Sequence, residues 1–106
     1  MSDKVRASHI LLMYKGSERS SATRSKDEAL TQINELKQQI DSGAEFAALA
    51  QQYSDCPSGQ QGGDLGAFGR GQMVRAFETA TFALDVGQTS GVVETAFGYH
   101  LIQRTG

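Results

Sequence analysis

One amphipathic helix is marked more clearly than any other element of this chain, and it follows an apolar run near the start. Ser25-Lys26-Asp27-Glu28 has the S-x-x-E form of a capping box, in which the serine hydroxyl accepts from an exposed backbone N–H and the glutamate reaches back. Before the stop signal at Gly43, apolar residues recur at helical spacing: Ala29, Ile33, Leu36 and Ile40. Any fold of this chain must therefore bury one face of a helix that begins after Ser25.

The order of the remaining elements predicts the fold class. Apolar runs and alternating patterns predict strands at residues 5–13, 64–68, 89–95 and 99–104. Helical patterns cover residues 45–53 and 74–84. The order β-α-α-β-α-β-β, with room for one extra short helix, favours an α+β domain with a mixed or antiparallel sheet. With 106 residues, the chain has the length of a single domain, residues 1–106.

Composition argues against several classes of function. The net charge of −2 differs from the strongly basic balance of nucleic-acid-binding domains. The longest apolar runs, such as residues 10–13, fall far short of the roughly 20 residues that a membrane span needs. No secretory signal is visible, and Cys56, the single cysteine, has no partner for an internal disulfide. We therefore expect a cytoplasmic monomer, or a nuclear one in a eukaryote, that binds neither nucleic acid nor membranes.

Positive charge is concentrated in residues 4–26, which hold six basic residues and one acidic residue. A local basic patch on an acidic protein favours a small anionic target over a long polyanion. We take Lys15, Arg19 and Arg24 as candidate anion-binding residues, because charge-assisted hydrogen bonds select anionic groups. A solvated basic loop without a binding role accounts for the same pattern equally well.

The two histidines of the chain both lie in predicted core strands. If the strands of His9 and His100 are adjacent, the imidazoles can share a hydrogen bond that fixes their tautomers. Two buried structural histidines are the plainer interpretation. A metal site has poor support, since no Cys or Asp cluster at ligand spacing accompanies them. Cys56 is either a nucleophile activated by a histidine or a small buried apolar residue.

Six of the twelve glycines fall between Gly59 and Gly71, around a predicted short strand. No Gly-Lys-Ser or Gly-Lys-Thr follows them, so the segment does not match a phosphate-binding P-loop and we expect no nucleotide cofactor. Four apolar residues in and after this segment are candidates either for ordinary core or for a pocket that holds an apolar ring: Leu65, Phe68, Met73 and Phe77.

Five blocks of sequence resemble one known family when they are taken together. They are Val5-Arg6-Ala7-Ser8-His9-Ile10-Leu11, Tyr53-Ser54-Asp55-Cys56, Gly63-Asp64-Leu65-Gly66-Ala67-Phe68, Arg70-Gly71-Gln72-Met73 with Phe77-Glu78, and Phe97-Gly98-Tyr99-His100. In this order they are similar to the parvulin family of peptidyl-prolyl cis/trans isomerases. The resemblance implies the parvulin (FKBP-like) fold, a four-stranded antiparallel sheet surrounded by helices. It also implies rotation about X–Pro bonds in proline-containing segments of client proteins, with no cofactor and no metal.

The resemblance also implies which residues form the site. The catalytic positions correspond to His9, Ser54, Cys56, Thr95 and His100. The proline-ring pocket corresponds to Leu65, Met73 and Phe77, with Phe68 nearby. Within the first group, Ser54 and Thr95 match hydrogen-bonding positions around the paired histidines.

The match is closer to the branch of the family that is directed at phosphoserine- or phosphothreonine-proline. Residues 17–29 resemble the basic loop and helix start of that branch, and Cys56 stands where many other parvulins have Asp. Four positions depart from the branch: Met13, Glu18, Val74 and Phe97. Met13 replaces a lysine and Glu18 one of two arginines, and the chain has no Trp and hence no WW module. We therefore expect a preference for acidic or phosphorylated residues before proline that is weaker than a full basic cluster would give.

Two other functions fit parts of the same pattern. A non-catalytic peptide-binding or chaperone module would use the same apolar cleft without accelerating rotation. A cysteine–histidine hydrolase would need an oxyanion hole and a histidine beside Cys56.

Overall fold

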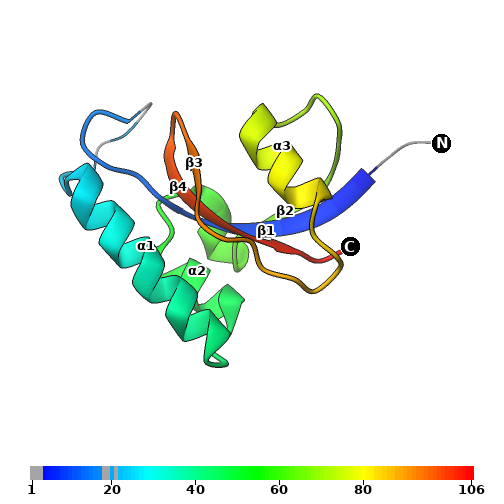
Figure 1. Ribbon diagram of the computed structural model, residues 1–106, viewed down its shortest axis with the longest axis horizontal. Coiled ribbons are helices and arrows are strands. Elements are labelled where there is room, and N and C mark those ends of the chain that lie inside the picture. Colours follow the sequence, from blue (N-terminus) through cyan, green and yellow to red (C-terminus); the bar gives the residue numbers. More distant parts are fainter. Residues whose placement is uncertain (1–3, 18–19, 21) are drawn as a thin grey trace.

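The computed structural model describes residues 4–17, 20 and 22–106, and its elements follow the predicted order (Figure 1). They are β1 (Lys4–Leu12), α1 (Lys26–Asp41), α2 (Phe46–Tyr53), the 3₁₀ helix η1 (Pro57–Gln61), β2 (Asp64–Gly69), α3 (Arg75–Phe82), β3 (Val93–Thr95) and β4 (Gly98–Arg104). The α+β class and the order β-α-α-β-α-β-β are confirmed, and η1 is the extra short helix. No helix among the described residues is long and apolar enough to cross a membrane.

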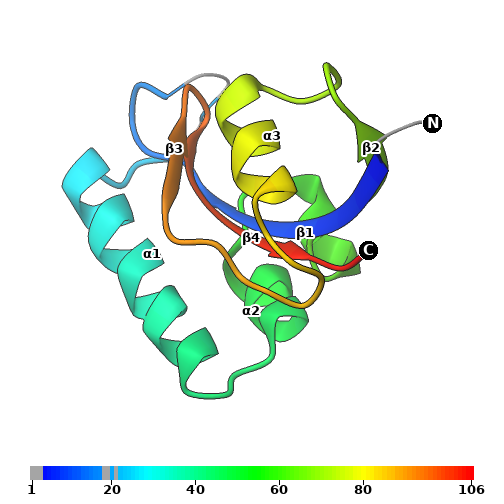
Figure 2. The same cartoon turned by 45° about the vertical axis from the view of Figure 1, so that its right-hand side comes forward.

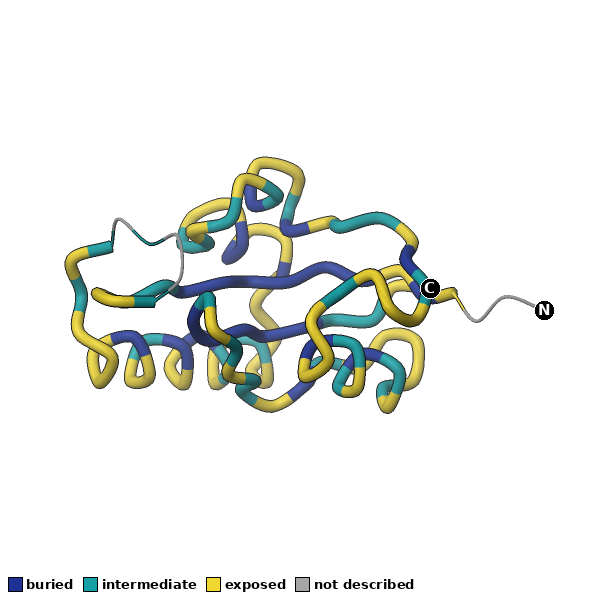
Figure 3. Tube along the Cα trace, turned by 90° about the horizontal axis from the view of Figure 1, so that it is seen from above, coloured by how far each residue is buried: buried dark blue, intermediate teal, exposed yellow. Residues whose placement is uncertain are grey.

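The four strands form one antiparallel sheet in the order β2-β1-β4-β3. The central strand β1 is buried on both faces, which explains why its sequence is nearly continuously apolar. Because side chains alternate along a strand, Ile10 and Leu12 pack with α1 and α2, whereas Val5 and Ala7 pack on the opposite face with Phe77 of α3. Figures 1 and 2 show α3 on one side of the sheet and α1 and α2 on the other. In Figure 3 the buried β1 runs through the middle of the molecule.

Helix α1 begins where the capping box predicts. The backbone N–H of Glu28 donates to the Ser25 hydroxyl at 3.1 Å, and the Ser25 N–H donates to the Glu28 carboxylate at 2.9 Å. The helix buries Ala29, Ile33 and Leu36 against the sheet, as their spacing predicts. The start of α1 therefore fixes where the basic loop between β1 and α1 ends.

The pairing of β1 with β2 is irregular next to His9. The register shifts between Arg6, opposite Ala67, and Ser8, opposite Asp64, and the His9 N–H donates to the Gly63 carbonyl at 2.9 Å. Gly63 has φ +84°, and a Cβ there would lie 2.3 Å from the His9 carbonyl oxygen. A glycine is therefore required at position 63, because any side chain would push the glycine-rich segment away from His9.

Strand β3 is shorter than the predicted 89–95. The segment before it still follows β4, since the Ser90 N–H donates to the Ile102 carbonyl at 2.7 Å. However, the Ile102 N–H donates to the Ser90 hydroxyl at 3.0 Å, so a side chain replaces a backbone carbonyl and interrupts the ladder. Helix α3 is likewise shorter than the predicted 74–84, starting at Arg75 and ending at Phe82.

Candidate active site

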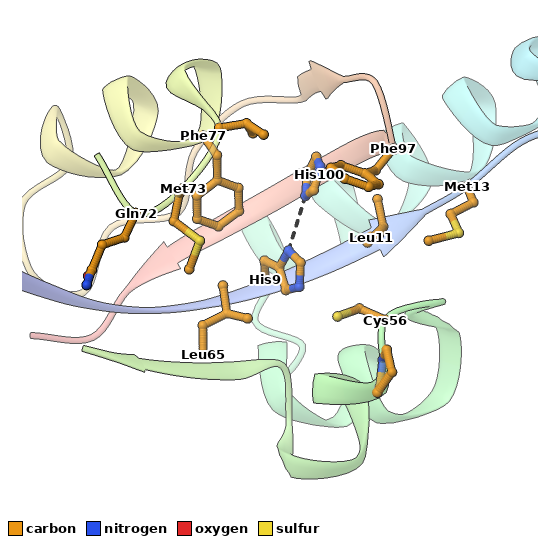
Figure 4. Close-up of a pocket in the computed structure, with 12 residues that line it drawn as sticks. His9, Leu11, Met13, Cys56, Leu65, Gln72, Met73, Phe77, Phe97 and His100 are labelled. Carbon is orange, nitrogen blue, oxygen red and sulfur yellow. Dashed lines mark hydrogen bonds between the residues drawn. The ribbon is translucent and has the colours of Figure 1, made fainter. Parts of the chain in front are cut away.

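A cavity of about 470 Å³ lies on the face of the sheet that α3 covers (Figure 4). Its volume falls within the range of about 300–1,000 Å³ that is typical of small-ligand pockets. Strands β1, β2 and β4, the segments around α3 and η1, and the β3–β4 turn all contribute to its lining. The lining residues are His9, Leu11, Met13, Cys56, Pro57, Leu65, Gln72, Met73, Val74, Phe77, Phe97 and His100.

The two histidines lie side by side on the floor of this cavity. They come from the paired strands β1 and β4, and their Nδ1 atoms are 3.1 Å apart. Nε2 of His100 is 2.8 Å from the Thr95 hydroxyl. The edge of Phe77 meets both imidazoles, with ring centroids 5.5 Å from His9 and 5.4 Å from His100. The predicted hydrogen bond between the histidines is therefore present, and it lies beneath an aromatic ring.

Burial keeps both histidines neutral near pH 7. It lowers the pKa of His9 from 6.5 to about 4. It also lowers the pKa of His100 to about 3, with a further contribution from the charge that His9 would carry. Neutral rings suit the observed contact, because one Nδ1–H can donate to the other Nδ1, whereas two protonated rings would oppose two donors. The cavity floor is therefore polar but uncharged.

One ring nitrogen of the histidine pair has no hydrogen-bond partner among the described side chains and backbone groups. Nε2 of His9 is buried and makes no hydrogen bond there. In Figure 4 this nitrogen lies on the side of the ring that faces Cys56. The Cys56 sulfur accepts a hydrogen bond from the Ser58 hydroxyl at 3.2 Å. A buried polar atom without a partner is costly, so the fold gives up some stability to hold this nitrogen beside the cavity.

Ser54 holds the backbone near the cavity and does not contact the histidines. Its hydroxyl accepts from the N–H of Leu11 at 3.0 Å and from the N–H of Cys56 at 3.3 Å. Ser54, expected at a hydrogen-bonding position around the histidines, thus bonds to the backbone of the two segments that border the cavity. Thr95 does bond to His100, as predicted.

Three of the four predicted pocket residues line the cavity together. Leu65 comes from β2, Met73 from the loop before α3, and Phe77 from α3. Phe68 is only 3% exposed and is absent from the lining. It packs behind Phe77, with ring centroids 6.0 Å apart, and therefore supports the pocket from the core.

The structure adds lining residues that the sequence pattern did not single out, above all Leu11. The alternation of β1 places Leu11 on the same face as His9, so period-two spacing from His9 would have found it. Pro57 and Gln72 had no such signal, because neither lies in a strand with period-two spacing. Met13, Val74 and Phe97, which depart from the phospho-directed branch, also line the cavity.

The candidate anion-binding residues have different surroundings. Lys15 is exposed on the loop after β1. Arg24 forms an ion pair with Asp55, with Nη1 at 2.5 Å from Oδ2, and also donates to the Met13 carbonyl at 2.9 Å. Arg19 lies outside the described residues. The described part of the chain holds no group of three or more His, Cys, Asp or Glu residues placed to bind a metal ion.

Comparison with known proteins agrees with this fold and cavity. The family model of the PPIC-type peptidyl-prolyl isomerase domain matches residues 1–106. The chain is 47% identical to peptidyl-prolyl cis-trans isomerase Pin1 of Digitalis lanata, over 99% of this chain and 98% of the relative. The solved structure of peptidyl-prolyl isomerase ESS1 from Candida albicans superposes with a TM-score of 0.91 at 37% identity, covering 97% of this chain and 63% of that one. The solution structure of TbPIN1 also gives a TM-score of 0.91, at 38% identity and with both chains fully covered.

The four-stranded sheet, the histidine pair and the apolar cavity define a domain of the parvulin class. The chain belongs to the PPIC-type peptidyl-prolyl isomerase family, and its activity is peptidyl-prolyl cis/trans isomerisation. Such an enzyme acts on proline-containing segments of proteins.

Proposed function

We propose that the cavity beneath α3 binds the proline ring between Leu65, Met73 and Phe77 and accelerates rotation about the preceding X–Pro bond. The observation that carries this proposal is the convergence of three apolar side chains, one from β2 and two from α3 and the loop that precedes it, on a floor of two neutral histidines. Rotation faces a barrier of about 20 kcal/mol because the amide must lose its resonance. No covalent bond has to break.

The cavity favours the twisted amide because it excludes water from the bond that rotates. The planar amide is the more dipolar form at its carbonyl, so loss of hydration destabilises it more than the twisted form. Only such a difference between the two states accelerates the reaction, since equal binding of both would not. The neutral histidine pair fits this role, because an ionised floor would retain water in the cavity. His9 and Cys56 both border this space.

The residue before proline is proposed to be acidic or phosphorylated, with a modest preference. Lys15 is exposed near the end of β1 and carries no described ion pair, which supports a role in attracting an anion. Two features argue for a weak preference. The side chain of Met13 brings an apolar surface to this end of the cavity, and the charge of Arg24 is balanced by Asp55. A monomer in the cytoplasm that binds neither nucleic acid nor membranes remains our proposal for its setting.

A coupled assay with Ala-Pro, Glu-Pro and phosphoserine-Pro peptides tests both parts of the proposal. We expect turnover of all three, and a kcat/KM for the two anionic peptides that is higher by about 1.4- to 5-fold, because exposed charge pairs contribute roughly 0.2–1 kcal/mol. Lys15→Gln should remove most of this difference and leave the Ala-Pro rate unchanged. Lys37→Gln, a change of one partly exposed lysine on α1 that lies outside the cavity lining, is the control and should have no effect.

Two results would contradict the proposal in different ways. Equal rates for the three peptides would reject an anion preference while leaving the isomerase site intact. Absence of acceleration for any peptide would reject the site itself.

A further inference from the structure

Beyond Ser8, the edge of β1 is paired with residues 54–55 and Gly63 in place of β2. The backbone N–H of Asp55 donates to the Leu11 carbonyl at 2.7 Å. The backbone N–H of Met13 donates to Oδ2 of the Asp55 carboxylate at 2.8 Å. Asp55 thus uses both its backbone and its side chain to hold the end of β1, just before Cys56 enters the cavity.

Arg24 completes this arrangement from the far end of the basic loop. Its Nη1 donates both to the Met13 carbonyl and to the same Asp55 oxygen. The N–H and the carbonyl of Met13 are therefore both hydrogen-bonded to this one ion pair. The Lys15 N–H donates to the Arg24 carbonyl at 2.8 Å, which closes the loop at its base. The side chains of Arg24 and Asp55 are 27% and 29% exposed. Partial burial protects such charge-assisted bonds from full solvent screening.

We propose that Arg24 and Asp55 form a clamp that positions Met13 and Cys56 in the cavity wall. Three segments meet at this one ion pair: the end of β1, the end of the basic loop and the segment that carries Cys56. Met13 is bonded through its backbone to both members of the pair, and Cys56 follows Asp55 directly in the chain. Arg24 is therefore a positioning residue, and we no longer count it among the candidate anion-binding residues. This role in turnover rests on the proposed function of the cavity.

The clamp is tested by measuring kcat and KM for the Ala-Pro and phosphoserine-Pro peptides with Arg24→Gln, Asp55→Asn and the double variant. We expect each single variant to lower kcat/KM about 10-fold, because displacement of site groups by about 1 Å can lower rates by up to about 100-fold. The loss should be the same for both peptides and should fall mainly on kcat. The double variant should be no worse than the more damaging single variant, since either change alone opens the clamp.

Two further variants provide the controls. Lys37→Gln with Asp41→Asn removes an ion pair of similar length, 2.8 Å, from the exposed surface of α1 and should leave both peptides unaffected. Arg24→Lys keeps the positive charge but loses the planar guanidinium group that donates to both partners. Its kcat/KM should therefore lie between that of Arg24→Gln and that of the wild type. If the neutral variants do not fold, a kcat/KM of Arg24→Lys below that of the wild type still supports the clamp, and an unchanged kcat/KM contradicts it.

A second measurement does not depend on isomerase activity. The backbone amide shifts of Leu11, Met13 and Cys56 should change in Arg24→Gln and Asp55→Asn, and Cys56 should react with iodoacetamide at least about 2-fold faster. A failure of the wild type to accelerate rotation would reject the proposed function, and these shifts would still test the clamp. The clamp is overturned if amide shifts and alkylation stay unchanged, or if Arg24→Gln harms only the phosphoserine peptide, as loss of an anion receptor would.

Discussion

Replacing Phe77 with alanine is expected to lower kcat/KM for an Ala-Pro peptide by about 10- to 100-fold, whereas Cys56→Ser and Cys56→Asp should cost less than about 10-fold. Phe77 is the largest apolar side chain shared by the proline pocket and the histidine floor. Burying an aromatic side chain against a ligand stabilises it by roughly 1.5–3 kcal/mol, and each 1.4 kcal/mol corresponds to about a factor of ten in rate. The Cys56 thiol borders the cavity but is not needed to break a bond.

A second aromatic residue of the same helix is the control for this prediction. Phe82 packs against Phe68, with ring centroids 6.4 Å apart, but does not line the cavity. Phe82→Ala should therefore lower the melting temperature while leaving kcat/KM close to that of the wild type. Coupled-assay rates at a temperature where all variants are folded make the comparison. A larger loss from Cys56→Ser than from Phe77→Ala would point to thiol chemistry and contradict the mechanism.

Lowering the pH from 7.5 to 5 is expected to reduce the free energy of unfolding by about 4 kcal/mol through the histidine pair. The native pKa values of about 4 and about 3 lie below the ordinary value of 6.5, so the unfolded chain binds protons that the folded chain excludes. Stability is therefore lost as the pH falls below 6.5, at about 2 kcal/mol per histidine at pH 5. The loss continues until the native pKa values are reached, and above about pH 7.5 these two groups have no further effect.

Urea unfolding at pH 7.5 and pH 5 measures this difference. His9→Gln and His100→Gln each remove one titrating group, so each variant should lose about 2 kcal/mol of the pH dependence, whatever its stability at pH 7.5. The carboxylates make the same contribution to the pH dependence of the free energy of unfolding in the variants and in the wild type. A pH dependence in both variants that equals that of the wild type would show that the histidines are not held neutral by the fold.

The local patterns of the sequence predict the parts of this structure that depend on near neighbours. The capping box at Ser25 marks the start of α1, and the apolar run of β1 reflects burial on both faces. The two histidines could meet only if their strands were adjacent, and the structure pairs those strands and brings the imidazoles together. Each of these predictions rests on spacing within a single segment or on the order of elements.

Other contacts could not be predicted because their partners are far apart in the chain and carry no distinguishing pattern. Nothing in the sequence indicates that Arg24 pairs with Asp55, and its basic neighbours favoured an anion-binding role instead. Ser54 bonds to the backbone of Leu11, because β2 leaves the edge of β1 before that residue. The interruption of β3 depends on the orientation of one hydroxyl, that of Ser90.

Exchange NMR of an Ala-Pro peptide with catalytic amounts of the protein tests most directly whether the cavity distinguishes a twisted amide from a planar one. The cis and trans signals should exchange much faster than in the free peptide, and the amide shifts of Leu65, Met73 and Phe77 should change on titration. Phe77→Ala should weaken both effects. If binding shifts those amide signals but cis–trans exchange is no faster, the cavity binds the planar and the twisted amide equally well. That result would contradict the proposed mechanism.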